Sequence, residues 1–317
     1  MRRCERRDDD LVPIMYLRCC FSHLILLAMR TAVSTALAAA LSAALPMASS
    51  AASRSATCAR HVSRMTTPAF STSTQQQPNH LLSTPPNGQE GSLRHSFFAL
   101  RHGQSLANVA KIISSDPAIS TVEHGLSDFG HEQAKDAGKQ FAEQFHAEND
   151  ASNEYFGVAI FSSDFVRARE TAQHMADACK AASIPLYKNE GVMLEKKLRE
   201  RNFGTLNGGS DDRYQDVWDV DITDPTHNEF GVESVYSVVE RTTRLVLDKD
   251  VELTEASKVD EKWKCILVAH GDVLQILQTG FKKMDGSLHR TLPHLETATV
   301  RELKVAAAPL CGYHAVE

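Results

Sequence analysis

The chain has 317 residues, 42% hydrophobic and 23% charged, a composition that fits a soluble globular protein and excludes a fibrous or wholly disordered one. Its net charge of −6 is unevenly spread, because residues 1–89 hold nine of the 34 basic residues and four of the 40 acidic ones. The remainder is therefore strongly acidic. This argues against nucleic acid as a partner, since nucleic-acid binding needs a basic face. If the substrate is an anion, positive charge must be concentrated in a pocket.

The first 90 residues differ in composition from the rest. From Leu11 to Gln89 there is no acidic residue, Ala and Ser dominate, and Arg is scattered. Such a segment cannot bury a core, and this composition is typical of an organelle transit peptide. We expect residues 1–90 to be a disordered leader, a targeting segment followed by a linker over residues 71–90, and residues 91–317 to form the folded domain.

The expected destination of the protein is the mitochondrion. The alternatives are a plastid, secretion, which the small apolar run Ala32–Ala48 would favour, and the cytoplasm if translation starts downstream at Met29. The apolar stretch Leu11–Met29 is interrupted by Arg18 and His23, so we expect no stable membrane span.

Three of the seven cysteines lie beyond the leader, namely Cys179, Cys265 and Cys311. Their wide spacing predicts neither a disulfide framework nor a zinc site, so we expect reduced thiols that pack as small apolar groups.

From residue 97 onwards, short apolar runs alternate with longer helical patterns. Buried strands are predicted at 97–101, 158–161 and 265–269, and a last strand at 297–303. Helices are predicted at 127–148, at 164–182 with Asp164 as N-cap, at 234–247, and from Val273. Residues 111–125 and 205–230 read as irregular loops. This alternation predicts an α/β three-layer sandwich, a mostly parallel sheet with helices on both faces.

Polar clusters follow three of the predicted strands. They are Arg101–Gly103, Ser162–Asp164 with Arg167 shortly after, and His270–Asp272. In sheets of this kind ligands bind beyond the carboxyl ends of the strands. We therefore expect the three clusters to converge on one site.

The chemistry of the first cluster suits an anion. Gly103 lacks a Cβ and lets the backbone approach a ligand, and a helix beginning near Gln104 or Ser105 would offer free N–H groups. Arg101 supplies a planar, permanently charged fork for phosphate oxygens. His102 could then attack phosphorus as a neutral imidazole. A purely structural histidine remains the alternative on this fragment alone.

Three further residues are candidates for the same site. Arg167 lies one turn into its helix and would point back over the helix N-terminus, although a surface arginine is the alternative. His270 repeats the setting of His102 and could equally be structural. Glu200 is our candidate proton donor to the leaving alkoxide, because a nearby phosphate raises the pKa of a carboxyl group. It could instead be an ion-pair partner of Arg199 or Arg201.

Taken together, five segments resemble the motifs of the histidine phosphatase superfamily, also called the phosphoglycerate mutase-like family. The resemblance spans about residues 96–304. The segments are Arg101–Asn108 (RHGQSLAN), Leu126–Ala134 (LSDFGHEQA), Ser162–Ala172 (SSDFVRARETA), Leu198–Gly204 (LRERNFG) and Val268–Gly271 (VAHG). Each motif is modest alone, but all five occur in the family's order.

The resemblance implies a role for each matching residue. His102 would be the phospho-acceptor. The phosphoryl group would be held by four residues, Arg101, Arg167, His270 and Asn108, with help from the backbone of Gly271.

Glu200 would donate the proton to the leaving group and then assist the water that hydrolyses phospho-His102. His102, Glu200 and His270 are thus the expected catalytic residues. The family needs no metal, and we expect no metal or other cofactor.

Departures from the family pattern favour a phosphatase over a mutase. Family mutases carry a long basic insert that grips the substrate carboxylate, and Asn-Ser follows their last His-Gly. Here residues 205–230 are acidic, with Arg213 alone positive, and Asp272-Val273 follows Gly271. We expect a phosphatase that hydrolyses a small phosphorylated metabolite. The alternatives are a phosphoglycerate mutase and a protein-directed phosphatase or scaffold of the same fold.

A metallophosphoesterase using His102, His270, Glu200 and Asp272 as ligands is a further rival. It is disfavoured because such sites need several Asp and His ligands around two metals, and the sequence has no run of that kind. The substrate would be selected by residues 111–125 and 205–230. The sequence leaves substrate identity and oligomeric state open.

Overall fold

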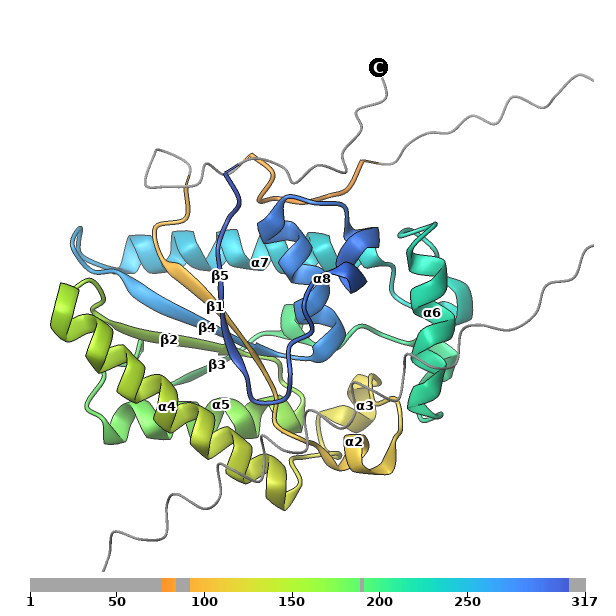
Figure 1. Ribbon diagram of the computed structural model, residues 1–317, viewed down its shortest axis with the longest axis horizontal. Coiled ribbons are helices and arrows are strands. Elements are labelled where there is room, and N and C mark those ends of the chain that lie inside the picture. Colours follow the sequence, from red (N-terminus) through yellow and green to blue (C-terminus); the bar gives the residue numbers. More distant parts are fainter. Residues whose placement is uncertain (1–75, 84–91, 189–190, 308–317) are drawn as a thin grey trace, which may run out of the picture. The chain divides into compact units, whose positions relative to one another are not determined.

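The computed structural model describes residues 76–83, 92–188 and 191–307 (Figure 1). Most of the predicted leader, with its targeting segment and Met29, lies outside these residues, as does Cys311. Among the helices described, none is long and apolar enough to cross a membrane. Cys179 and Cys265 are free and buried, as expected for thiols that act as apolar groups.

The described residues form one five-stranded sheet with strand order β3-β2-β4-β1-β5. The strands are β1 (Ser96–Arg101), β2 (Gly157–Ser162), β3 (Val192–Leu194), β4 (Trp263–Ala269) and β5 (Val300–Leu303). β1, β2, β3 and β4 run parallel, and β5 pairs antiparallel with β1. The prediction of a mostly parallel α/β sheet is confirmed.

The α-helices are α2 (Leu106–Ala110), α3 (Pro117–Ser120), α4 (Asp128–Ser152), α5 (Val166–Ala181), α6 (Tyr214–Asp221), α7 (Val235–Ala256) and α8 (Gly271–Lys282). Short 3₁₀ turns occur at η1 (Lys196–Leu198), η2 (Gly204–Leu206), η3 (Asp211–Arg213), η4 (Glu229–Gly231) and η5 (Gly286–Thr291). α4 begins where the Ser127 side chain accepts a hydrogen bond from the Gly130 N–H, so Ser127 is its N-cap.

Two helices cover each face of the sheet (Figure 1). Successive side chains of a strand point to opposite faces. In β4, Leu267 therefore packs with α7 and α8, while its neighbours Ile266 and Val268 pack with α4 and α5. Because both faces are covered, β4 is buried along its whole length. This explains why its sequence is a continuous apolar run rather than an alternating one.

Several elements differ from the sequence-based expectation. α5 begins at Val166 and has no side-chain cap, so the prediction of Asp164 as N-cap is wrong. The carboxylate of Asp164 is bound instead to Arg199. The loop predicted over 205–230 contains α6, and the loop over 111–125 contains α3. β3 was not predicted.

Residues 76–83 fall inside the segment predicted to be a linker, yet they pack on α7 and α8. Leu81 is fully buried within the core cluster that includes the inner faces of those helices. The Gln77 side chain donates to the carbonyl of Met284 (3.2 Å) and accepts from the backbone N–H of Gly286. Asn79 donates to a carbonyl near the end of α8 (3.0 Å). This short segment therefore contributes to the core of the domain.

Candidate active site

The three polar clusters predicted to converge do so at the carboxyl ends of β1, β2 and β4. The backbone N–H of His102, just beyond β1, donates to the carbonyl of Ala269 (3.0 Å). The N–H of Ser163, just beyond β2, donates to the carbonyl of Val268 (2.9 Å). These bonds extend the parallel pairing past the strand ends and bring the following turns together.

The hydrogen bonds of His102 define its tautomer. A carbonyl oxygen can only accept, so Nδ1 donates to the carbonyl of Gly103 (2.7 Å). Nε2 therefore carries the lone pair, and Nε of Arg167 donates to it (3.1 Å). Burial, and then the charges of Arg167 and Arg101, lower the pKa of His102 well below its ordinary value. The ring is thus a neutral imidazole at neutral pH, with Nε2 as its nucleophilic atom.

Arg167 is held rigidly in the first turn of α5. Its side chain is 3% exposed, and its Nη2 donates to the carbonyl of Ser114 (2.9 Å). Burial lowers its pKa to about 10, so the guanidinium remains charged at neutral pH. The structure thus places Arg167 next to His102, and its role in holding a phosphoryl group stays a prediction.

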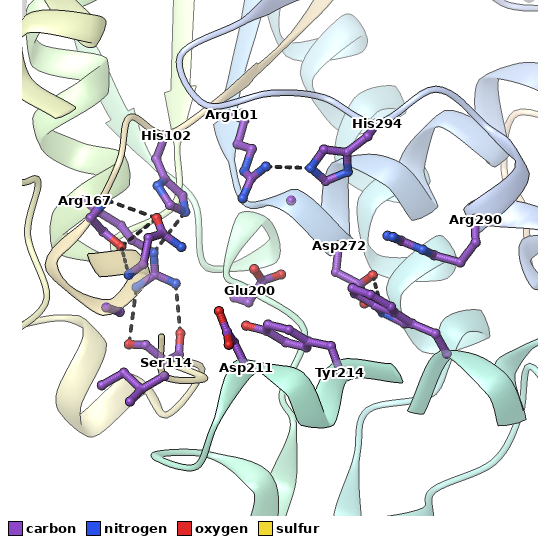
Figure 2. Close-up of a pocket in the computed structure, with 16 residues that line it drawn as sticks. Arg101, His102, Ser114, Arg167, Glu200, Asp211, Tyr214, Asp272, Arg290 and His294 are labelled. Carbon is purple, nitrogen blue, oxygen red and sulfur yellow. Dashed lines mark hydrogen bonds between the residues drawn. The ribbon is translucent and has the colours of Figure 1, made fainter. Parts of the chain in front are cut away.

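Arg101 approaches from the end of β1 (Figure 2). Its Nη1 donates to the carbonyl of Leu295 (3.0 Å) and bonds Nε2 of His294 (2.7 Å). A Cβ added to Gly271 would lie 3.3 Å from the Arg101 guanidinium. Glycine at this position therefore gives the guanidinium room to lie close to the start of α8.

The structure shows a packing reason for glycine at position 103. A Cβ at this position would lie 2.5 Å from the carbonyl oxygen of Gly130 in α4. The absence of a side chain therefore lets the turn pack against the first turn of α4. The expected approach of a ligand to the Gly103 backbone stays a prediction. The following helix, α2, begins at Leu106 with Ser105 as its N-cap.

Asn108 lies in that first turn of α2 and also lines the pocket. Its Oδ1 accepts from the N–H (3.0 Å) and the hydroxyl (2.9 Å) of Ser105. These bonds orient the amide group and connect it to the turn that carries His102.

The ring of His270 lies next to the ring of His102. The two ring centroids are 5.1 Å apart, and Nε2 of His270 bonds the hydroxyl of Ser163 (2.9 Å). The ring is fully buried, and its Nδ1 has no hydrogen-bond partner among the residues the structure describes. His270 is not among the residues that line the pocket. Its role in holding a phosphoryl group therefore stays a prediction.

Glu200 lines the pocket across from this cluster (Figure 2). Its Oε1 accepts from the N–H of Arg201 (3.0 Å). Exclusion of water, and then the charge of Asp272, raise the pKa of Glu200 to about 7, although Arg167 opposes the shift. A carboxyl group that is partly protonated at neutral pH can donate a proton and later accept one.

The two arginines on either side of Glu200 bind carboxylates in two different parts of the fold and so hold the segment in place. Arg199 binds both oxygens of Asp164 (2.7 and 2.6 Å), next to the start of α5. Arg201 is fully buried and binds both oxygens of Asp221 in α6 (2.6 and 2.7 Å). Both flanking arginines are thus committed to other carboxylates, so the alternative reading of Glu200 as their ion-pair partner is wrong.

The pocket encloses about 340 Å³ and brings six of the seven predicted site residues together: Arg101, His102, Asn108, Arg167, Glu200 and Gly271. The other lining residues are Ser105, Ala107, Ile112, Ser114, Asp211, Tyr214, Trp218, Asp272, Arg290 and His294. Both predicted substrate-selecting segments contribute, through Ile112 and Ser114 from one and Asp211, Tyr214 and Trp218 from the other. Arg290 and His294 were missed, because they lie between α8 and β5 and belong to no recognised motif.

Within the described part of the chain, no group of three or more His, Cys, Asp and Glu side chains is arranged to hold a metal ion. Of the ligands that the metal-dependent alternative would use, Asp272 is bound to Trp218 (3.0 Å) and Arg201 (3.3 Å). His102 is bound to Arg167 through Nε2. These side chains are occupied by other protein groups.

Residues 97–308 match the histidine phosphatase superfamily (branch 1), and the chain belongs to this family. Two curated relatives are similar in sequence. A 2,3-bisphosphoglycerate-dependent phosphoglycerate mutase of Bartonella quintana is 31% identical over 38% of this chain and 48% of its own length. A probable phosphoglycerate mutase of Erwinia tasmaniensis is 26% identical over 62% of this chain and 78% of its own length. The chain thus spans about half the length of the Bartonella relative.

Solved structures share the fold. The mycobacterial glucosyl-3-phosphoglycerate phosphatase complexed with VO3 aligns with a TM-score of 0.51 at 22% identity, over 66% of this chain and 90% of that one. A structure described as mycobacterial hydrolase 2 aligns with a TM-score of 0.50 at 22% identity, over 66% of this chain and 81% of that one. These likenesses confirm the fold. Relatives and neighbours include both mutases and phosphatases.

Proposed function

We propose that the protein is a metal-independent phosphatase that hydrolyses a small phosphomonoester through a phosphohistidine on His102. The observation that carries the proposal is the state of His102. Its Nδ1–H donates to the Gly103 carbonyl, and its Nε2 lone pair lies at the end of a pocket whose three arginines have no carboxylate partner among the described residues. A nucleophile is thereby placed where a phosphoryl group would be bound.

In the first step the Nε2 lone pair attacks phosphorus, a P–N bond forms and the ester P–O bond breaks. The leaving oxygen takes the proton of Glu200. Arg167, which donates to Nε2 in the structure, would donate instead to a phosphoryl oxygen once substrate occupies this position. Positive charge on the phosphorylated ring is stabilised by the Gly103 carbonyl, and the arginines stabilise the phosphoryl oxygens in the transition state.

In the second step water attacks the phosphorus of phospho-His102. The Glu200 carboxylate takes a proton from this water, the P–N bond breaks, and its electron pair returns to Nε2. Inorganic phosphate leaves, and both His102 and Glu200 regain their starting protonation states. No metal or other cofactor enters either step.

Phosphoglycerate mutase activity is the second candidate, because both curated relatives described above carry that name. The two activities differ in whether the phosphoryl group of phospho-His102 passes to water or to a bound product. An incubation with 3-phosphoglycerate in which both free phosphate and the phosphoglycerate isomers are followed separates them. Isomer interconversion ten times faster than phosphate release would make the protein a mutase.

The proposal is tested by replacing His102 with Ala and by quenching the wild-type protein during turnover of a phosphate-labelled ester. We expect turnover to be lost in His102→Ala and the label in wild type to be on His102. His131→Ala is a matched control, since His131 contacts His174 on the helices and does not line the pocket. Label on another residue, or turnover that survives His102→Ala, would overturn the mechanism.

The targeting of residues 1–90, with the mitochondrion as the expected destination, stays a prediction. It is tested by following a full-length tagged protein in cells and determining the N-terminus of the mature form. An intact leader on a protein found only in the cytosol would contradict it.

A further inference from the structure

Three arginines line the pocket, Arg101, Arg167 and Arg290, and none of them forms an ion pair with a described carboxylate. By contrast, neighbouring arginines outside the pocket form ion pairs with carboxylates. Arg199, for example, is paired with Asp164. The proposed reaction needs two of the three pocket cations for the phosphoryl group. The third, Arg290, is not explained by it.

Arg290 is held by groups that leave its charge uncompensated. Its guanidinium stacks on the ring of Trp218, 3.7 Å from the centroid, and its Nη1 donates to the Oε1 atom of Gln275 (3.1 Å). Trp218 is itself fixed, because it stacks on Tyr214 and its Nε1 donates to Asp272 (3.0 Å). Stacking and one bond to a neutral amide orient a guanidinium but leave several of its N–H donors available.

The same glutamine connects Arg290 to the phosphoryl end of the pocket. Oε1 of Gln275 can only accept, so Nδ1 of His294 donates to it (3.0 Å). Nε2 of His294 therefore accepts from Nη1 of Arg101 (2.7 Å). The distal and proximal cations are thus positioned by one hydrogen-bonded framework of neutral groups.

The arrangement places Arg290 on the side of the leaving group. In Figure 2, His102 and Arg167 lie at one end of the pocket, Arg290 lies at the other, and Glu200 lies between them. A proton donor must be close to the ester oxygen, so a phosphoryl group on His102 directs the alcohol part of the ester past Glu200. That part would then extend towards Arg290.

We propose that Arg290 is a specificity residue that binds an anionic group on the leaving alcohol, a singly charged group such as a carboxylate. This inference rests on the proposed phosphatase function. One guanidinium neutralises one negative charge, and the remaining acids of the pocket, Asp211 and Asp272, disfavour a second. The planar fork of an arginine also matches the two oxygens of a carboxylate.

The proposal is tested on the full chain with two pairs of esters that differ only in a carboxylate. One pair is 3-phosphoglycerate and glycerol 3-phosphate, and the other is 4-carboxyphenyl phosphate and phenyl phosphate. The measured quantity is kcat/KM for consumption of the ester by any route. We expect wild type to favour the carboxylate ester of each pair by at least tenfold. In Arg290→Gln we expect kcat/KM to fall much further for the carboxylate esters than for the neutral ones, so that this preference is lost.

Two further variants separate charge from structure. Arg290→Lys retains the charge and should keep a preference of at least threefold for the carboxylate esters. It also provides the test if Arg290→Gln proves unstable. Arg213→Gln removes an exposed arginine that pairs with Asp216 and does not line the pocket, so it should keep the full preference.

The outcomes distinguish the two proposals. A wild-type protein that consumes the esters of each pair equally, or a preference that survives Arg290→Gln or is absent in Arg290→Lys, would overturn the role of Arg290. Failure to consume any of the four esters, with no label on His102, would instead overturn the phosphatase function itself.

Discussion

At the scale of single residues, the two groups proposed to exchange protons and phosphate have pKa values shifted in opposite directions. The pKa of His102 lies well below its ordinary value, so the ring stays a neutral nucleophile in mildly acidic solution. The pKa of Glu200 is raised to about 7, so its protonated form persists at neutral pH. The active combination, neutral His102 with protonated Glu200, is therefore favoured in mildly acidic to neutral solution.

We predict that kcat/KM falls as the pH rises above about 7, because the proton of Glu200 is then lost. Asp272→Asn removes a negative neighbour, so the pKa of Glu200 should drop and the decline should begin at lower pH. Phosphate esters themselves have a second pKa of about 6, so their titration affects the acidic limb of the profile. The alkaline limb is therefore the one that reports on Glu200. Asp224→Asn, an exposed change outside the pocket, should leave the profile unchanged. An alkaline limb that does not move in Asp272→Asn would show that this carboxylate does not act on Glu200.

We also predict that Glu200→Gln slows the hydrolysis of alkyl phosphates more than that of phenyl phosphates. A phenoxide is a good leaving group and needs little help from a general acid, whereas an alkoxide needs a proton. The measurement is the ratio of wild-type to variant kcat/KM for a series of esters. Equal slowing across the series would indicate that Glu200 has a structural or charge-balancing role.

At the scale of elements, α6 is bound to the segment that carries Glu200 by the buried pair of Arg201 and Asp221. Both side chains are fully buried, so removing one partner leaves a charge without water or a full counter-ion. We predict that Asp221→Asn lowers the free energy of unfolding by about 3 kcal/mol, measured by urea denaturation. Asp219→Asn in the same helix, where the exposed carboxylate accepts from Gln215, should have an effect below about 0.5 kcal/mol. Equal effects of the two variants would contradict the anchoring role.

The elements also show which parts of the structure could be predicted from the sequence. β1, β2 and β4 were predicted because they are buried on both faces and read as continuous apolar runs. β3 was missed because it has three residues and none of them is fully buried. α6 was missed because the acidic residues around it resemble a solvated loop, although Asp221 is buried and paired with an arginine.

The same physical reasons apply to the site. His102 follows a strand and Arg167 lies in the first turn of a helix, where the spacing along the chain indicates the position in space. Glu200 lies between η1 and η2 and was identified through its resemblance to a family motif. Arg290 in η5 and Trp218 in α6 are 72 positions apart in the sequence, and they meet only because the fold brings these two elements together. No local pattern predicts such a contact. The acidic character of residues 205–230 therefore suggested a pocket that repels carboxylates, while the structure places an arginine at its far end.

At the scale of the whole molecule, the acidic composition of the domain is compatible with a pocket lined by arginines. Several acidic side chains of residues 205–230 bind local donors. Asp216 is paired with Arg213, and Asp224 accepts from Thr226. Of the acids in this range, Asp211 alone lines the pocket. Net charge thus describes the outer surface of the domain, and the local arrangement of arginines describes what the pocket attracts.

The folded domain also extends beyond the boundary expected near residue 90, because residues 76–83 pack on α7 and α8. We predict that a chain starting at residue 76 is as stable as the full chain, whereas a chain starting at Gly91 is destabilised. The main reason is Leu81, which is fully buried in the core, and Leu→Ala changes at such positions cost about 2–5 kcal/mol. Leu81→Ala in the full chain should therefore lower the free energy of unfolding within that range, measured by urea denaturation. The matched control is Ser83→Ala, an exposed change in the same segment. Equal stability of the chains starting at residues 76 and 91 would show that the segment is dispensable and would restore the boundary at residue 90.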